Sequence, residues 1–288
     1  MILEELKKKD LEKIFDQNSK IIIDFLLKRT LISYPEFLEG QNQKSVYLEK
    51  KQCEQWIVQS LGLKPVGEGS YPIDGIDKNS VGYDVSTVNW GVTKTGKNKT
   101  ETGEKSLSQK FSDSNFGNEE DTLDELFKNK KFTEILNNWK TILKNKWNNT
   151  IKEKSLKKII LINLVKHSVL NKMYILGLQI NPENIDQCEI KSPKVLKKTS
   201  KKTKEPASVH VSNFISDELG SIKIYKSKKR IELRIKPEKW LENNSYIEFS
   251  YKFNNKVKNL REEFLNRKKP FLKELAKEYI KFLKEFLN

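Results

Sequence analysis

The chain has 288 residues, of which 36% are hydrophobic and 10% aromatic, which is enough apolar material for a folded globular protein. It carries 55 Lys and Arg against 39 Asp and Glu, a net charge of +16, and this excess favours a phosphate-rich partner, although a Lys-, Asn- and Ile-rich chain also places lysines on ordinary solvated faces. The chain contains no apolar run of the roughly 18 residues that span a bilayer, and its N-terminus lacks a signal-peptide pattern, so we expect a cytoplasmic protein with no membrane partner.

Cysteine and histidine are too few for several kinds of site. Cys53 and Cys188 are the only cysteines and neither lies in a CxxC motif, which favours structural thiols over a disulfide framework or a zinc site. The only histidines are His167 and His210, so a histidine-based nuclease or a multi-histidine metal site lacks its ligands. No GxxxxGK[ST] loop is present, and NTP hydrolysis is not expected.

In chain order, the first elements are helical. Apolar residues recur every three or four positions through the first sixty residues, including residues 46–63. Glycines and a proline then lead into a predicted β-hairpin at residues 70–88. Residues 91–118 are polar and predict a long loop, with one short helix near residues 107–111.

The second half of the chain alternates helices and strands. Residues 122–148 predict a pair of helices docked on a core. Two short runs rich in Ile, Leu and Val, residues 159–165 and 173–180, suit buried strands. Residues 221–235 alternate in polarity, as expected of a half-buried hairpin with a basic outer face. An apolar stripe after Pro270 predicts a C-terminal helix that docks on the core or on a partner subunit.

These patterns suggest three segments. Residues 1–190 are expected to form a helical N-terminal part and a catalytic core, and residues 207–288 a β-hairpin and C-terminal helices packed on that core. Residues 191–206 connect them as a basic loop or linker, since residues 191–204 hold seven lysines and no acid.

The chemistry of the chain is concentrated in the predicted hairpin. If its loop is Lys78-Asn79-Ser80, Asp74 on one strand faces Asp84 on the other, with Cβ atoms about 4.5 to 5.5 Å apart. Two opposed carboxylates repel unless a cation or a proton neutralises them, so the pair predicts a Mg²⁺ site. The alternative is that these acids only form turns, and a two-residue loop would place Asp74 opposite Tyr83.

Pro72-Ile73-Asp74-Gly75, Asp84-Val85-Ser86 and Glu54 on the preceding helix resemble the acidic motifs of the PD-(D/E)xK nuclease superfamily, to which many type II restriction endonucleases belong. The order helix, hairpin, helix, strand, strand is similar over residues 46–180. The resemblance implies an α/β fold: a restriction-endonuclease-like mixed central sheet flanked by helices. It also implies that Asp74, Asp84 and the Val85 carbonyl hold Mg²⁺ while Glu54 supports them.

The chain departs from the family at its lysine position, which holds Ser86 on the same face as Asp84. A lysine from the next segment could take this role, with Lys94, Lys105 and Lys110 as candidates. We include Lys110 in the expected catalytic set. The metal alone could instead activate the water, or the site could be inactive.

The function implied by the resemblance is Mg²⁺-dependent, sequence-specific cleavage of double-stranded DNA by a type II restriction endonuclease. The lysine-rich loop and the basic strand at residues 230–236 would contact phosphates, and the C-terminal stripe could form a homodimer. The alternatives are a non-catalytic nucleic-acid-binding protein on the same fold, an RNA-cutting toxin or a repair nuclease.

Overall fold

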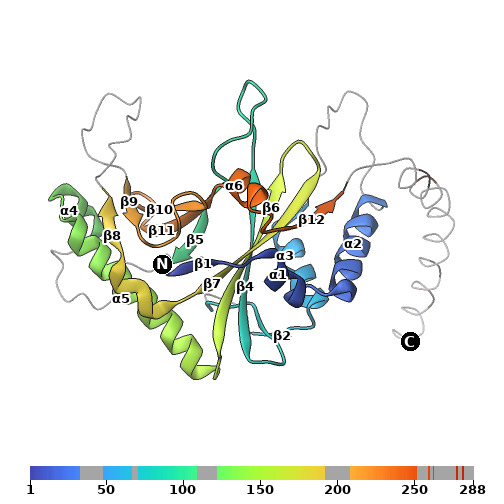
Figure 1. Cartoon of the computed structure of the whole chain (residues 1–288), viewed down its shortest axis with the longest axis horizontal. Coiled ribbons are helices and arrows are strands. Elements are labelled where there is room, and N and C mark those ends of the chain that lie inside the picture. The colour runs from blue at the N-terminus through green and yellow to red at the C-terminus, as the bar shows by residue number, and fades with distance from the viewer. Residues whose placement is uncertain are drawn as a thin grey trace.

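A computed structural model describes residues 1–32, 48–66, 71–108, 122–191 and 208–251, together with Asn259, Glu262, Lys277 and Lys281. The chain has a mixed α/β architecture with two sheets and several helices (Figure 1). No described helix is both long enough and apolar enough to cross a membrane.

The first half of the chain contains the elements β1 (Leu3–Glu5), α1 (Lys8–Ile14), α2 (Gln17–Ile32), α3 (Lys50–Ser60), β2 (Lys64–Pro65), β3 (Gly75–Ile76), β4 (Val81–Trp90), β5 (Lys105–Ser108), α4 (Leu123–Lys128) and α5 (Phe132–Glu153). The second half contains β6 (Lys158–His167), β7 (Lys172–Ile180), the short 3-10 helix η2 (Pro182–Gln187), β8 (Glu189–Lys191), β9 (Ser208–Ser212), β10 (Gly220–Tyr225), β11 (Arg230–Ile235), α6 (Pro237–Glu242) and β12 (Ile247–Ser250).

The first sheet is mixed and has the strand order β1-β7-β6-β4-β3-β2, with β12 also paired to β7. The pair β4 and β6 is parallel, and the other pairs are antiparallel. The predicted strands at residues 159–165 and 173–180 are confirmed as β6 and β7, which lie at the centre of the sheet. Their apolar runs are continuous because both faces of these strands are covered.

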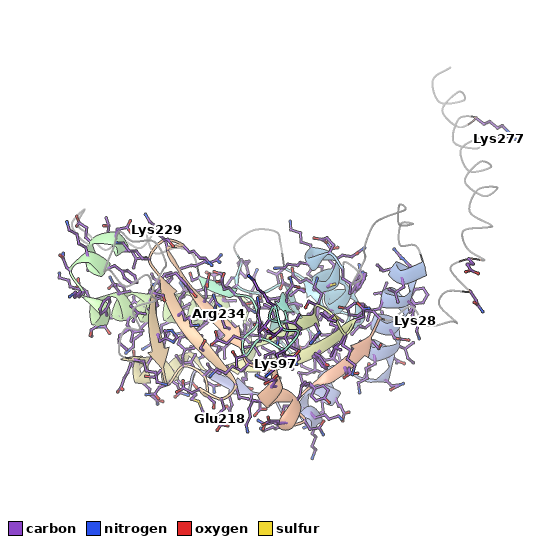
Figure 2. All side chains as sticks on the ribbon, turned by 90° about the horizontal axis from the view of Figure 1, so that it is seen from above. Lys28, Lys97, Glu218, Lys229, Arg234 and Lys277 are labelled. Carbon is purple, nitrogen blue, oxygen red and sulfur yellow. The ribbon has the colours of Figure 1, made fainter. Side chains whose placement is uncertain are left out.

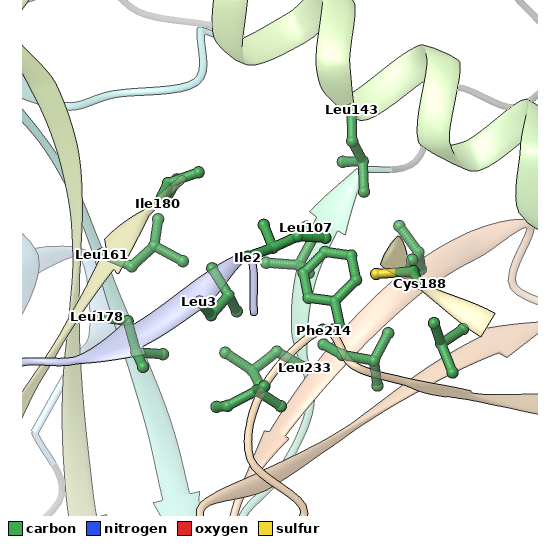
Figure 3. Packing of buried hydrophobic residues seen from close by; sticks show 14 of the residues in the cluster. Ile2, Leu3, Leu107, Leu143, Leu161, Leu178, Ile180, Cys188, Phe214 and Leu233 are labelled. Carbon is green, nitrogen blue, oxygen red and sulfur yellow. The ribbon is translucent and has the colours of Figure 1, made fainter. Parts of the chain in front are cut away.

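Helices cover one face of the first sheet, and the second sheet with α4 and α5 covers the other (Figure 1). Along β4, Val81, Tyr83 and Val85 pack in the cluster formed with α1, α2 and α3, whereas Val88 and Trp90 pack on the opposite side. Figure 3 shows this second cluster, in which Leu107, Leu143, Leu161, Leu178 and Leu233 converge from different elements. The alternation of side chains along β4 therefore assigns each residue to one of two cores.

The second sheet has the order β5-β11-β10-β9-β8. The predicted hairpin at residues 221–235 is confirmed as β10 and β11. Neither sheet comes from one of the expected segments alone, because β5 pairs with β11 and β12 pairs with β7. Residues 192–207, which include most of the expected basic linker, lie outside the described residues.

Two local predictions are wrong. Leu3–Glu5 is a strand instead of the beginning of a helix, because its backbone pairs with the edge of β7. Lys105–Ser108 is also a strand, where a loop with a helix near residues 107–111 was expected, because β11 supplies a partner. The predicted helix pair is confirmed as α4 and α5, and both cysteines are buried free thiols, as expected. Most of the expected C-terminal helix lies outside the described residues.

Candidate active site

The hairpin register agrees with the three-residue loop. Gly75 pairs with Tyr83 and Ile76 with Gly82, as the predicted loop Lys78-Asn79-Ser80 requires. The Asp77 carboxylate fixes the turn by accepting hydrogen bonds from the N–H groups of Asn79 (2.8 Å) and Val81 (2.9 Å). Asp77 is thus a structural residue of the turn.

The ladder ends one residue before the expected pair of acids. Asp74 lies outside β3, and its N–H donates to the carbonyl of Tyr83 at 2.7 Å. Direct cross-strand pairing of Asp74 with Asp84, as the hairpin was expected to provide, is therefore wrong. Asp74 immediately precedes β3, and its side chain is free to turn toward the edge of β4.

The carboxylates of Asp74 and Glu54 occupy the edge of β4, beyond the N-terminal end of β3. The carbonyls of Ser80 and Trp90 accept hydrogen bonds from the N–H groups of Lys157 and Ser168, the residues just before and just after β6. The backbone N–H and C=O groups at even-numbered positions of β4 therefore point toward β6. The odd-numbered positions face the opposite edge. There the N–H of Val85 donates to Asp74 Oδ2 at 2.6 Å, and the N–H of Thr87 donates to Glu54 Oε1 at 2.9 Å. The Val85 carbonyl oxygen shares this edge with both carboxylates.

Asp84 and Ser86 project on the face of β4 that looks toward the second sheet. Lys105, the first residue of β5, reaches Asp84 from that sheet, with Nζ 3.3 Å from Oδ2. Ser86 Oγ lies 3.5 Å from Asp84 Oδ1, a long contact. Lys105 therefore places a positive charge beside Asp84.

The charge of Lys105 is held in a dry environment. Its side chain is only 3% exposed, and Nζ donates no hydrogen bond to any described residue. Lys146 on α5 approaches the same region and donates to the Leu107 carbonyl at 2.7 Å. Burial lowers the pKa of Lys146, the Asp84 carboxylate raises it, and the neighbouring Lys105 lowers it further. Two cations therefore share the surroundings of Asp84.

The two acids on the strand edge are electrostatically coupled. Burial raises the pKa of Asp74, and the charge of Asp84 adds to this increase, while the Val85 N–H and Lys105 act in the opposite direction. Burial also raises the pKa of Glu54, with further increases from Asp74 and Asp84 and an opposing effect of the Thr87 N–H. Carboxyl groups with raised pKa values in one cleft are typical of catalytic or metal-binding sites.

A cleft of about 750 Å³ opens beside these acids. It is lined by residues of α3, of the segment around β2 and of the approach to β3, including Glu54, Gln55, Tyr71 and Asp74. Polar side chains can thus reach a ligand that lies along this edge.

A divalent cation fits the donors in part. Among the described residues, no group of three or more His, Cys, Asp and Glu side chains is arranged to hold a metal ion. The available oxygens are the carboxylates of Asp74 and Asp84 and the carbonyl of Val85, which are hard ligands suited to Mg²⁺. Mg²⁺ keeps several water ligands in most protein sites, so two carboxylates and one carbonyl are chemically sufficient.

The other candidates lie elsewhere. Lys94 is exposed in a turn beyond the end of β4, and Lys110 lies outside the described residues. A further polar residue, Asn163 on β6, was not anticipated. It lies beside Ser86 in the parallel register, is fully buried, and leaves both side-chain atoms without a described hydrogen-bond partner. Only its position inside an apolar strand could have drawn attention to it.

The basic strand does not present free arginines. Arg234 forms an ion pair with Glu104, and Arg230 forms ion pairs with both Glu104 and Glu232. The expected phosphate contacts of residues 230–236 therefore compete with internal carboxylates.

The chain matches no protein-family model, no curated protein and no solved structure. Its functional interpretation therefore depends on the geometry of the residues at the edge of β4.

Proposed function

We propose that this chain is a Mg²⁺-dependent endonuclease of the PD-(D/E)xK type that cleaves double-stranded DNA, with the role of a type II restriction endonuclease. The observation that carries the proposal is the position of Lys105. It brings a buried ammonium group to 3.3 Å from Asp84, next to the strand whose edge holds Asp74 and Glu54. Two acids, a backbone carbonyl and a lysine are the functional groups that the resemblance implies.

In this proposal Asp74, Asp84 and the Val85 carbonyl hold Mg²⁺, which would lower the pKa of a bound water and neutralise charge that develops on the phosphate. The protein groups then have separate tasks. Lys105, with unused N–H donors, binds the attacking water or a nonbridging phosphate oxygen. Glu54 holds the Thr87 N–H and so keeps the strand edge in place beside the cleft. Lys146 adds positive charge behind the phosphate.

The test is cleavage of unmethylated plasmid DNA with Mg²⁺ by the purified protein and by the variants Asp74→Asn, Asp84→Asn and Lys105→Met. Asp24→Asn and Lys8→Met, on the outer helices, are matched controls for the loss of one charge. We expect discrete fragments from the wild type and both controls, and a loss of at least about 100-fold in each site variant, since removal of one electrostatic stabiliser has effects of this order. Intact DNA under all conditions would refute catalysis.

One observation favours the non-catalytic alternative. Lys105 already neutralises Asp84 without a metal, so the hairpin could persist as a scaffold for nucleic-acid binding. Under this alternative, Mg²⁺ should neither stabilise the protein nor support cleavage, while DNA should still bind. An RNA-cutting toxin would be recognised in the same assay by preferential cleavage of RNA, and a repair nuclease by preferential cleavage of damaged duplexes.

A further inference from the structure

Two turns emerge side by side from the end of β4 and β6. Trp90 is opposite His167 in the parallel register, and the N–H of Ser168 donates to the Trp90 carbonyl at 2.9 Å. Beyond this point β4 continues into residues 91–99, which we name the basic turn, and β6 turns into β7 through residues 168–171, which we name the apolar turn. Figure 1 shows both projecting from the same end of the first sheet.

One buried histidine joins the two turns. Nδ1 of His167 accepts hydrogen bonds from the N–H groups of Val169 (3.2 Å) and Leu170 (3.1 Å), and Nε2 lies 2.9 Å from Asn98 Oδ1. Because Nδ1 accepts two donors, the proton is on Nε2 and is donated to Asn98. Burial lowers the pKa of His167, which keeps the ring neutral and this arrangement intact.

Trp90, the last residue of β4, holds the basic turn in place. Its indole N–H donates to the Lys99 carbonyl at 2.7 Å, and its ring contacts that of His167 edge-on, with centroids 4.8 Å apart. At the tip, the N–H of Gly96 donates to the Thr93 carbonyl (3.0 Å) and the N–H of Thr93 donates to the Lys97 carbonyl (2.7 Å). Gly96 adopts a φ of 83° that favours glycine. The basic turn is thus an ordered structure with a defined position.

The two turns expose lysines and large apolar side chains at the same end of the first sheet. Lys94, Lys97 and Lys99 are all exposed, and the basic turn contains no acid. Figure 2 looks down on this end of the molecule and shows Lys97 near the middle of the view. On the apolar turn, Val169 is 49% exposed and Leu170 is 42% exposed, a costly placement for two large apolar side chains at the tip of a hairpin.

From this arrangement we infer that the two turns form a duplex-binding surface in which Lys94, Lys97 and Lys99 contact phosphates while Val169 and Leu170 enter a groove. Basic side chains that contact phosphates position a protein on the duplex, and apolar side chains inserted between base steps from the minor groove are a known means of binding it. The inference rests on the proposed function and extends it to a substrate contact away from the acids.

The strand sets the distance between this surface and the acids. Gly91 lies seven positions after Asp84, which is about 23 Å of extended strand at roughly 3.3 Å per residue. This span equals about seven base pairs at 3.4 Å each. We therefore place the contact on duplex that flanks the cleaved phosphate.

The experiment measures binding of the full-length protein to a fluorescent 30-base-pair duplex in EDTA, by anisotropy, at salt concentrations from 50 to 200 mM. The slope of log K against log salt is negative, and each phosphate contact adds about 0.9 to its magnitude. The triple variant Lys94→Ala, Lys97→Ala, Lys99→Ala should therefore reduce this magnitude by about 2.7. The factor by which the triple variant weakens binding should therefore be about 40 times larger at 50 mM salt than at 200 mM salt. Val169→Ser with Leu170→Ser should weaken binding without changing the slope.

A control triple variant, Lys8→Ala, Lys9→Ala, Lys152→Ala, removes the same charge from exposed positions on α1 and α5. If this control lowers the slope as much as the triple variant of the basic turn, the inference is overturned, because only net charge would matter. It is also overturned if the variants of the basic turn lose binding to vesicles of phosphatidylserine and phosphatidylcholine but keep binding to the duplex.

Binding in EDTA is independent of cleavage, so the two proposals fail separately. Loss of binding in the variants of the basic turn, in a protein that never cleaves DNA, supports the surface and refutes catalysis. Normal binding by these variants, with cleavage abolished only by the variants of Asp74, Asp84 and Lys105, supports catalysis and refutes the surface.

Discussion

Asp84→Asn should destabilise the folded protein much more than Lys105→Met, when both are measured without divalent cations. The substitution Asp84→Asn leaves the ammonium of Lys105, which is 3% exposed, without a countercharge. It also leaves Lys105 and Lys146 to repel each other across a buried region. Lys105→Met instead removes the buried charge, and the remaining Asp84 carboxylate, 26% exposed, is reached by water and by the field of Lys146.

The separation of 3.3 Å gives the magnitude. Two unit charges at this distance attract by about 5 kcal/mol at an effective dielectric constant of roughly 20. Partial exposure of Asp84 reduces the effect, and we expect Asp84→Asn to lower the free energy of unfolding by about 3 kcal/mol. Lys105→Met should cost less than about 1 kcal/mol, because an apolar side chain of similar volume replaces a desolvated charge.

The assay is chemical denaturation of the wild type, both single variants and the double variant at pH 7.5 in EDTA, which together form a double-mutant cycle. In thermal unfolding, Asp84→Asn should lower Tm by roughly 6 to 12 °C. The double variant should recover most of the stability that Asp84→Asn loses. Equal losses in the two single variants, or no loss in Asp84→Asn, would show that Lys105 is not buried against Asp84.

Three further predictions concern other groups. Burial raises the pKa values of Glu54 and Asp74 in the folded protein. At pH values between the ordinary carboxyl pKa and the raised one, the folded protein binds more protons than the unfolded chain, so the free energy of unfolding falls as pH rises through this range. Glu54→Gln should reduce this fall when unfolding is measured against pH, and an unchanged profile would contradict the prediction. Asn163→Leu should stabilise the protein by about 1 to 3 kcal/mol, since both unpaired polar atoms are removed; a decrease in stability would reveal a bound water or another partner. Gly220→Ala should cost about 1 to 3 kcal/mol, because the added Cβ would lie 2.7 Å from the Arg234 carbonyl oxygen; an unchanged unfolding midpoint would contradict this.

Local patterns predicted most of the individual elements. The strands β6 and β7 follow from apolar runs, and the helices α4 and α5 follow from helical periodicity, because both patterns reflect burial of one or two faces. The hairpin register followed from turn chemistry. Asp77 accepts hydrogen bonds from two N–H groups of its own turn, and Ser80 takes a positive φ of 61°, so this turn is specified within a few residues.

The site was predicted in part. Asp74, Asp84 and Glu54 were identified from the sequence, and all three lie together at β4, where the charges of Asp74 and Asp84 both raise the pKa of Glu54. Their geometry was not predicted, because β3 begins only at Gly75 and the side chain of the preceding Asp74 accepts a hydrogen bond from the Val85 N–H. Lys105 was one of three lysine candidates, and nothing in its local sequence separated it from Lys94.

The sequence by itself determined the strands, helices and turns whose residues satisfy one another locally, together with the acids that a cation or a lysine must neutralise. The tertiary structure decided the rest. The short strands Leu3–Glu5 and Ile247–Ser250 form only because β7 offers unpaired backbone groups. Lys105 reaches Asp84 only because β11 draws Lys105–Ser108 into the second sheet and holds it against β4. Contacts between segments far apart in the chain depend on partners that no local pattern encodes.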